Sequence, residues 1–208
     1  MIDVTKIDYL VTSHTEPDHA GSVERLLDYS PQMKILATPC AISFLKEIVN
    51  RDFVSIAVKD DQRMTIGKRT LHFMLVPNLH WPDTMYTFIE EEQILVTCDS
   101  FGSHYCLKEV VSDKIENEDD YLKALRYYFD CIIGPYKPFM REGPGPGGVS
   151  GYQHGVHGPT GPVLVGDKIE RRVMALYREW STVVNPNRKR PLSSYVSAYG
   201  YTGLLAEK

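Results

Sequence analysis

Over its first 135 residues the chain alternates short apolar runs with stretches of helical spacing, and this alternation restricts it to a mixed α/β fold. Runs rich in β-branched and aromatic residues predict strands at 6–12, 33–38, 53–58, 70–76, 85–89 and 93–97. Apolar residues at helical spacing predict helices over 23–27, 41–49, 118–133 and 168–183. The acidic turn Glu90–Glu92 joins the last two strands as a hairpin. The sequence therefore predicts an α/β sandwich with hairpins interleaved among helices.

Charge and composition exclude several classes of protein. The formal net charge is -4 and no basic face is concentrated in the sequence, so nucleic acid is not an expected partner. No run is apolar enough to cross a bilayer, and the start of the chain lacks a signal-peptide pattern. We therefore expect a soluble, cytoplasmic protein. Cys40, Cys98, Cys106 and Cys131 show no CxxC pairing, and we expect free, buried thiols.

The segment His14-Thr15-Glu16-Pro17-Asp18-His19 lies between a predicted strand and a predicted helix. In an extended turn the side chains of His14, Glu16 and Asp18 point the same way, because successive residues alternate in direction. One imidazole and two carboxylates form a ligand set that suits iron or manganese. The motif therefore predicts a metal site after the first strand.

Two further candidate ligands follow other predicted strands. His80 opens the string His80–Met85, and Asp99 comes directly after the strand at 93–97. Strand ends of one sheet lie side by side, so we expect both residues to share a pocket with the first motif.

The order of these residues resembles that of the flavodiiron proteins, also called A-type flavoproteins. In this chain His-x-Glu-x-Asp-His is followed by His80 and then by Asp99, and His80–Met85 is similar to the most recognisable string of that family. The resemblance covers about residues 6–136 and then 163 to the end. It implies a metallo-β-lactamase-like αββα sandwich, N-terminally truncated, in residues 1–184. A linker at 185–191 would then lead into the first strand and phosphate loop of a flavodoxin-like domain at 192–208.

The resemblance also implies the ligands of two non-haem irons. They are His14, Glu16, Asp18, His80, Asp99 and a final histidine, for which His157 is the best candidate. One iron would take His14, Glu16 and His80, the other Asp18 and the final histidine, with Asp99 bridging both. His19 is expected to hydrogen-bond near the site without binding metal.

Other residues near these motifs are given plainer interpretations. Trp81 and Tyr86 are expected to be core aromatics, with gate aromatics near the site as the alternative. His72 is expected to be a surface or hydrogen-bonded core histidine. His104 follows the Asp99 turn, and a role facing the substrate stays open for it.

The segment between Gly143 and Gly161 contains eight of the fifteen glycines, and it predicts an exposed, irregular loop. This segment contains no predicted helix or strand that would hold His157 in place. The alternative interpretation is therefore that His154 and His157 are solvated loop histidines. We hypothesise that residues 143–160 are translated out of frame. With suitable codons, a one-base shift would read as a helix, a strand and a Gly-His-Gly-Pro turn.

Near the end of the chain, the residues after the predicted strand at 192–196 resemble the phosphate loop of flavodoxin-like domains. Small and hydroxyl side chains let backbone N–H groups hold a phosphate there. The expected FMN-binding residues are Ser197, Tyr199, Gly200, Tyr201 and Thr202.

The resemblance implies an oxidoreductase that reduces dioxygen to water or nitric oxide to nitrous oxide with electrons from FMN. A rubredoxin or a reduced flavin system would be the electron donor, and the whole protein would form a head-to-tail homodimer. We expect the 208 residues alone to be inactive, since they hold almost none of a flavin-binding sheet. The alternative is a zinc-dependent hydrolase on the same scaffold, which would need imidazole in place of Glu16.

Overall fold

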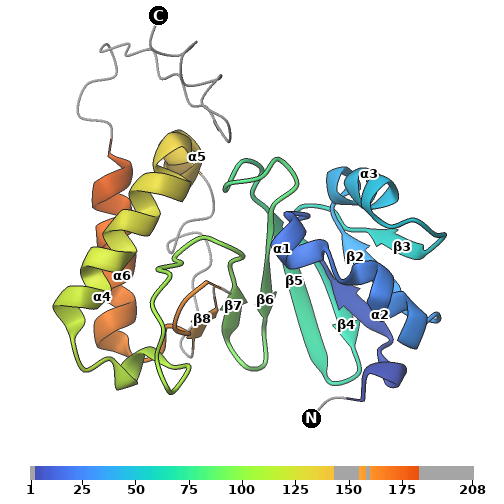
Figure 1. Ribbon diagram of the computed structural model, residues 1–208, viewed down its shortest axis with the longest axis horizontal. Coiled ribbons are helices and arrows are strands. Elements are labelled where there is room, and N and C mark those ends of the chain that lie inside the picture. Colours follow the sequence, from blue (N-terminus) through green and yellow to red (C-terminus); the bar gives the residue numbers. More distant parts are fainter. Residues whose placement is uncertain (1–2, 143–154, 158–159, 183–208) are drawn as a thin grey trace, which may run out of the picture.

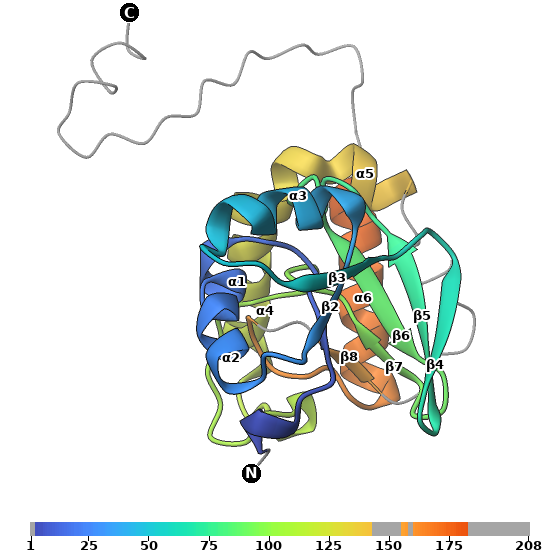
Figure 2. The same ribbon diagram turned by 90° about the vertical axis from the view of Figure 1, so that its right-hand side faces the viewer.

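The computed structural model describes residues 3–142, 155–157 and 160–182. Two β-sheets lie between two groups of helices, α1–α3 on one side and α4–α6 on the other (Figure 1). Figure 2 views the molecule from the side of α1–α3. This is the four-layered αββα sandwich that the resemblance implies.

The first sheet has three parallel strands in the order β1-β2-β3. They are β1 (Tyr9–Val11), β2 (Lys34–Ala37) and β3 (Val54–Ala57). A 3-10 turn, η1 (Val4–Lys6), precedes β1, so the predicted strand at 6–12 is shorter than expected. The helices of this half are α1 (Pro17–Ala20), α2 (Val23–Tyr29) and α3 (Pro39–Ile48). Thr38 caps α3, because its hydroxyl accepts the N–H of Ala41 at 3.0 Å.

The second sheet has five strands in the order β4-β5-β6-β7-β8. They are β4 (Gln62–Ile66), β5 (Arg69–Leu75), β6 (Met85–Ile89), β7 (Ile94–Val96) and β8 (Gly155–His157). The first four pair antiparallel, and β8 pairs parallel to β7. Sequence reasoning missed β4 because its residues are largely polar. A turn at Gly67, with φ of 61°, folds β4 back onto β5.

The strand β8 corrects the expectation that the glycine-rich segment holds no regular structure. Its backbone pairs with β7, and pairing with a formed strand overrides the low strand propensity of glycine. Residues 143–154 and 158–159 lie outside the described residues, so the hypothesis of an out-of-frame segment is still a prediction. The linker and the expected flavodoxin-like strand and loop also lie outside them.

The helices on the second sheet begin with η2 (Ser112–Lys114) and α4 (Glu118–Tyr128). Asn117 caps α4 by accepting the N–H of Asp120, and three acidic residues fill its first turn. A π-helical turn, η3 (Phe129–Ile133), completes the predicted helix at 118–133. The remaining elements are η4 (Gly134–Tyr136), α5 (Lys137–Glu142) and α6 (Asp167–Ser181).

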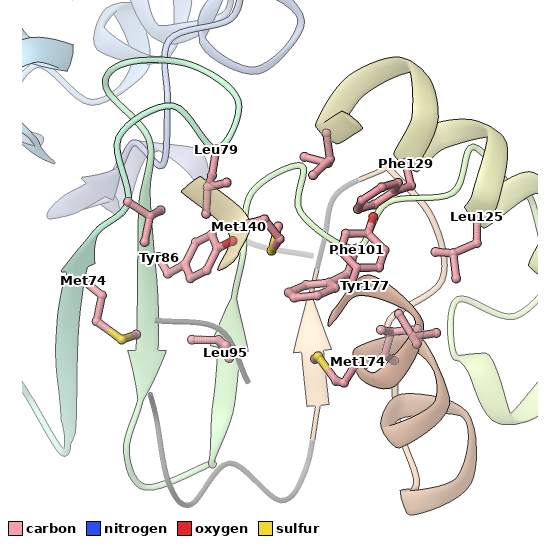
Figure 3. Close-up of a cluster of buried hydrophobic side chains, with 14 of the residues drawn as sticks. Met74, Leu79, Tyr86, Leu95, Phe101, Leu125, Phe129, Met140, Met174 and Tyr177 are labelled. Atoms are coloured by element: carbon pink, nitrogen blue, oxygen red, sulfur yellow. The ribbon is translucent and has the colours of Figure 1, made fainter. Parts of the chain in front are cut away.

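Three buried clusters fill the spaces between the four layers. The largest joins the second sheet to α4 and α6 through side chains such as Tyr86, Phe129 and Tyr177 (Figure 3). A second joins the first sheet to α2 and α3. The third lies between the sheets and includes Phe73 and Met85, both fully buried. Each such side chain stabilises the fold by about 1.5–3 kcal/mol through burial.

Two expectations about the whole chain can be compared with the described residues. Among them, no helix has both the length and the apolar character needed to span a membrane. All four cysteines are free, as expected. Only Cys98 is buried, however; Cys106 and Cys131 are exposed and Cys40 is half-buried.

Candidate metal centre

The first ligand loop follows β1 and is tied to its neighbours by hydrogen bonds. The N–H of Met85 donates to the carbonyl of Ser13 at 2.8 Å. The hydroxyl of Thr15 donates to the buried carboxylate of Asp83 at 2.8 Å. Beyond this loop the chain enters α1 at Pro17, with Glu16 as its N-cap residue. These contacts hold the histidine and the carboxylate of the motif against the second sheet.

Asp99 lies in a tight turn after β7. The hydroxyl of Thr97 donates to the carbonyl of Ser100 at 2.9 Å, and the phenol of Tyr86 donates to the hydroxyl of Ser100. Cys98 and Phe101 have φ angles of 53° and 69°. A left-handed residue other than glycine costs about 1–2 kcal/mol, so the hydrogen bonds of this turn and its packing must hold it in place.

Four of the predicted ligands converge at one point. The Nε2 atom of His80 lies 2.9 Å from Asp99 Oδ2 and 3.1 Å from Glu16 Oε2. The Nε2 atom of His14 lies 3.4 Å and 3.2 Å from the same two oxygens. The four ligand atoms lie within 4.8 Å of one another, which is close enough to surround one cation.

The other oxygen of Asp99 faces a second group of side chains. Asp99 Oδ1 lies 3.3 Å from His19 Nε2 and 3.5 Å from the hydroxyl of Thr160. His19 Nε2 in turn lies 3.5 Å from Asp18 Oδ2. The carboxylate of Asp99 therefore separates two groups of potential metal ligands, one at each oxygen.

The charges of the site favour an ionised Asp99. Burial raises the pKa of Asp99, but hydrogen bonds with His14 and His80 and the charge of His19 lower it more, and the net pKa lies below its ordinary value. Burial lowers the pKa of His14, yet Asp99 and Glu16 raise it more. A carboxylate that stays ionised is ready to bind a cation.

A cavity of about 480 Å³ adjoins the second group. Its polar end includes Asp18, His19 and Thr160, and its apolar wall includes Leu10 and Leu26. The centre thus has an open side at Asp18 and His19.

His19 Nε2 lies 3.3 Å from Asp99 Oδ1, a contact that fits the hydrogen-bonding role expected from the sequence. Its ring also lies in a group with His14, Cys98 and Asp99 that could hold a metal ion. The one-turn helix α1 brings it back to the site. Its place directly after Asp18, at the start of a helix, was the available signal.

Three other histidines named in the sequence analysis have different surroundings. The register of β8 places His157 opposite Val96, at the strand end from which Asp99 also emerges. His72 bonds to Asp61 at 2.7 Å, so it is a satisfied histidine as expected. His104 is exposed, and its ring meets Tyr128 edge-on.

The two aromatic residues predicted as core lie beside the site. Tyr86 is buried, and Trp81 is partly buried with its ring 6.0 Å from that of His14. The predicted FMN-binding residues lie outside the described part of the chain: Ser197, Tyr199, Gly200, Tyr201 and Thr202.

Comparison with known proteins places this geometry in a family. Residues 1–135 match the family described as "ODP family beta lactamase". The whole chain aligns with the flavo-diiron protein FprA2 of Clostridium acetobutylicum at 34% identity and with diflavin flavoprotein A 1 of Synechocystis at 38%. The chain belongs to the flavodiiron proteins. It spans 52% and 35% of the lengths of these two relatives.

Solved structures agree with this assignment. The rubredoxin oxygen:oxidoreductase of Desulfovibrio gigas superposes with a TM-score of 0.81 at 28% identity, over 87% of this chain and 45% of that one. The flavodiiron protein of Giardia intestinalis gives 0.79 at 28% identity, over 86% and 43%. The flavodiiron chain therefore has a metallo-β-lactamase-like fold with a candidate metal site of histidine and aspartate residues.

Proposed function

We propose that the chain holds most of a dinuclear non-haem iron centre, and that the whole protein reduces dioxygen to water or nitric oxide to nitrous oxide. One observation carries the proposal: the two carboxylate oxygens of Asp99 face two separate groups of ligands. A carboxylate in this position can bridge two cations. Its low pKa keeps it ionised for that task.

The chemistry of the ligands supports iron over zinc. Glu16 Oε2 lies within 3.2 Å of both His14 and His80, so a hard carboxylate occupies the ligand shell of the first group. The zinc hydrolase alternative needs imidazole at this position. A mixed set of imidazoles and carboxylates fits a non-haem iron centre better.

The proposed ligands divide between the two irons according to the geometry. The first would be held by His14, Glu16, His80 and Asp99. For the second we propose Asp18, His19, Asp99 and, from the end of β8, His157. Including His19 departs from the sequence-based expectation, and it follows from its 3.3 Å approach to Asp99 Oδ1.

The chain's own residues prepare the site for a small diatomic substrate. An iron pair bound here supplies electrons and polarises the substrate. Asp99 would place negative charge between the two cations, and the rings of Trp81 and Tyr136, which lie beside those of His14 and His80, would shield the site from water. The partly apolar cavity beside Asp18 and His19 suits an uncharged diatomic gas.

The electrons would come from FMN held by the loop at Ser197–Thr202 and the rest of a flavodoxin-like domain. The D. gigas relative is named for rubredoxin and oxygen. We propose a rubredoxin or a reduced flavin system as donor here, and a head-to-tail homodimer in which the flavin of one subunit serves the irons of the other.

Anaerobic loading with Fe²⁺ tests the metal centre directly. The chain should take up about two irons, one for each group of ligands around Asp99. Iron content by mass spectrometry and Mössbauer spectroscopy give the readout. Stoichiometric zinc with no iron uptake would refute the proposal.

A further inference from the structure

The imidazole of His14 is contacted at both nitrogens by two consecutive residues. Cys98 Sγ lies 2.7 Å from Nδ1, and Asp99 Oδ2 lies 3.4 Å from Nε2. His14 and Cys98 are each 1% exposed, so the contact between them is largely shielded from bulk water. Sulfur and carboxylate together form a clamp on one ring, which we call the Cys98–Asp99 clamp.

The backbone of the turn explains how two consecutive residues, Cys98 and Asp99, can contact the ring of His14. In an extended strand, successive side chains point to opposite faces. Cys98 has a φ of 53°, in the left-handed region, which interrupts this alternation just after β7. The hydrogen bonds between Thr97 and Ser100 close the turn around the pair. The unusual backbone is therefore what brings both side chains to His14.

We propose that Cys98 is a positioning residue that orients His14 for metal binding. The inference rests on the proposed function and deepens it. A histidine that binds metal through Nε2 carries its proton on Nδ1, and the partner of that N–H fixes the tautomer and the ring orientation. Here the partner is Cys98 Sγ. When a metal displaces the proton of Nε2, the proton held at Nδ1 would leave the lone pair of Nε2 directed at a cation between Glu16 and Asp99.

A sulfur partner has a chemical consequence for the ring. Metal-bound histidines usually donate to a carboxylate, a carbonyl or water, and these partners raise the basicity of the ligand. A thiol sulfur is a weak acceptor, so it orients His14 with less increase in basicity. Cys98 thus sets the geometry of this ligand while leaving it a weaker electron donor than an oxygen partner would.

The alternative is that Cys98 itself binds the metal. Its sulfur belongs to a group with His14, His19 and Asp99 whose ligand atoms lie within 4.8 Å of one another. The sulfur faces Nδ1, however, whereas Glu16 and Asp99 Oδ2 face Nε2 on the other side of the ring. The geometry therefore favours an orienting role.

Titration with Co²⁺ separates the two roles in the 208-residue chain. Cys98→Ala should weaken Co²⁺ binding about 10- to 100-fold, the usual cost of removing a partner of a metal-bound histidine. Cys98→Ser should restore most of the affinity, because its hydroxyl accepts the same N–H. Cys131→Ala removes an exposed thiol and should bind like the parent. An orienting thiol gives no sulfur-to-cobalt charge-transfer band in the near ultraviolet.

Three results would overturn the role of Cys98. They are unchanged Co²⁺ affinity in Cys98→Ala, an affinity in Cys98→Ser as low as in Cys98→Ala, and a charge-transfer band in the parent that Cys98→Ala loses. Thermal unfolding of the metal-free variants shows whether a loss of affinity reflects a loss of fold.

A readout without metal keeps this inference separate from the proposed function. In the metal-free chain, the ring ¹⁵N resonances of His14 should shift in Cys98→Ala and stay unchanged in Cys131→Ala. If the parent bound neither Fe²⁺ nor Co²⁺, the dinuclear centre would be wrong. An unshifted His14 resonance in Cys98→Ala would instead count against the clamp alone.

Discussion

The two halves of the candidate centre, one at each oxygen of Asp99, are built differently. At Oδ2 the side chains are mostly enclosed: those of His14, His80 and Glu16 are 0%, 12% and 31% exposed. At Oδ1 they are more open, with the side chain of Asp18 66% exposed and that of His19 17%. Asp18 and His19 also border the cavity of about 480 Å³, which His14 reaches from the other half.

The difference follows from the elements that carry each half. The enclosed half draws on three loops that hydrogen bonds tie together, such as that between Thr15 and Asp83. The open half rests on α1, a four-residue helix with no side-chain cap, and on Thr160. Enclosed, cross-tied ligands are better preorganised, so the metal at Oδ2 should bind more tightly. Under the proposed function, a substrate would approach at the more open half.

Removing the carboxylate shared by both halves should have the largest effect. Two dications about 4 Å apart repel by on the order of 15 kcal/mol at an effective dielectric constant of about 20. Asp99→Ala removes the charge between them, so we expect the loss of both irons. Iron content by mass spectrometry after anaerobic loading measures the effect.

A conservative variant sharpens this prediction. Asp99→Asn keeps the shape but supplies a neutral, weaker ligand, so its iron content should fall between those of the parent and Asp99→Ala. If Asp99→Ala retained both irons, Asp99 would not bridge the two halves.

Variants of one histidine in each half should have smaller and unequal effects. His19→Ala removes a ligand from the open half only, so we expect about one iron per chain, retained in the enclosed half. His80→Ala is the matched variant of the enclosed half, and it should reduce the tighter of the two binding steps. Isothermal titration with Fe²⁺ under anaerobic conditions resolves the two steps. A full complement of two irons in His19→Ala would return His19 to the hydrogen-bonding role that the sequence alone suggested.

The fold could be predicted wherever hydrophobic periodicity is strong. β6 at 85–89 and the helix at 118–133 follow directly from their apolar spacing. β4 was missed because it is a polar edge strand, and an edge needs little apolar surface. β8 was missed because its three residues form a strand only by pairing with β7, a contact far away in the sequence. Local propensity cannot supply such long-range pairing.

The candidate site, like the fold, could be predicted only in part from the sequence. Strand ends and the spacing of the motifs were enough to bring His14, Glu16, His80 and Asp99 together. The position of Cys98 depends on a left-handed turn, and that of Thr160 on a segment 61 residues beyond Asp99 in the sequence. Neither can be predicted from a local sequence pattern. The position of the His19 ring could be predicted only with the knowledge that α1 turns this ring toward the site.

The smallest effect should come from the hydroxyl of Thr160. It lies 3.5 Å from Asp99 Oδ1 and 3.1 Å from the phenol oxygen of Tyr128. Gly102 permits this approach, because a Cβ there would clash with Thr160 and with the ring of Tyr128. Thr160→Val keeps the shape of the side chain and removes only the hydroxyl. A hydrogen bond of this kind contributes about 0.5–1.5 kcal/mol, so the affinity of the open half for Fe²⁺ should fall about twofold to tenfold.

Tyr128→Phe tests whether the effect of Thr160 runs through Asp99. This variant removes the other partner of the Thr160 hydroxyl and leaves the contact with Asp99 Oδ1 in place. If the hydroxyl acts by orienting Asp99 Oδ1, Tyr128→Phe should bind Fe²⁺ like the parent. In Thr160→Val the weaker of the two binding steps should change, while the tighter step at Oδ2 should not. Equal weakening of both steps, or an effect of Tyr128→Phe as large as that of Thr160→Val, would show that the two oxygens of Asp99 do not serve separately built halves.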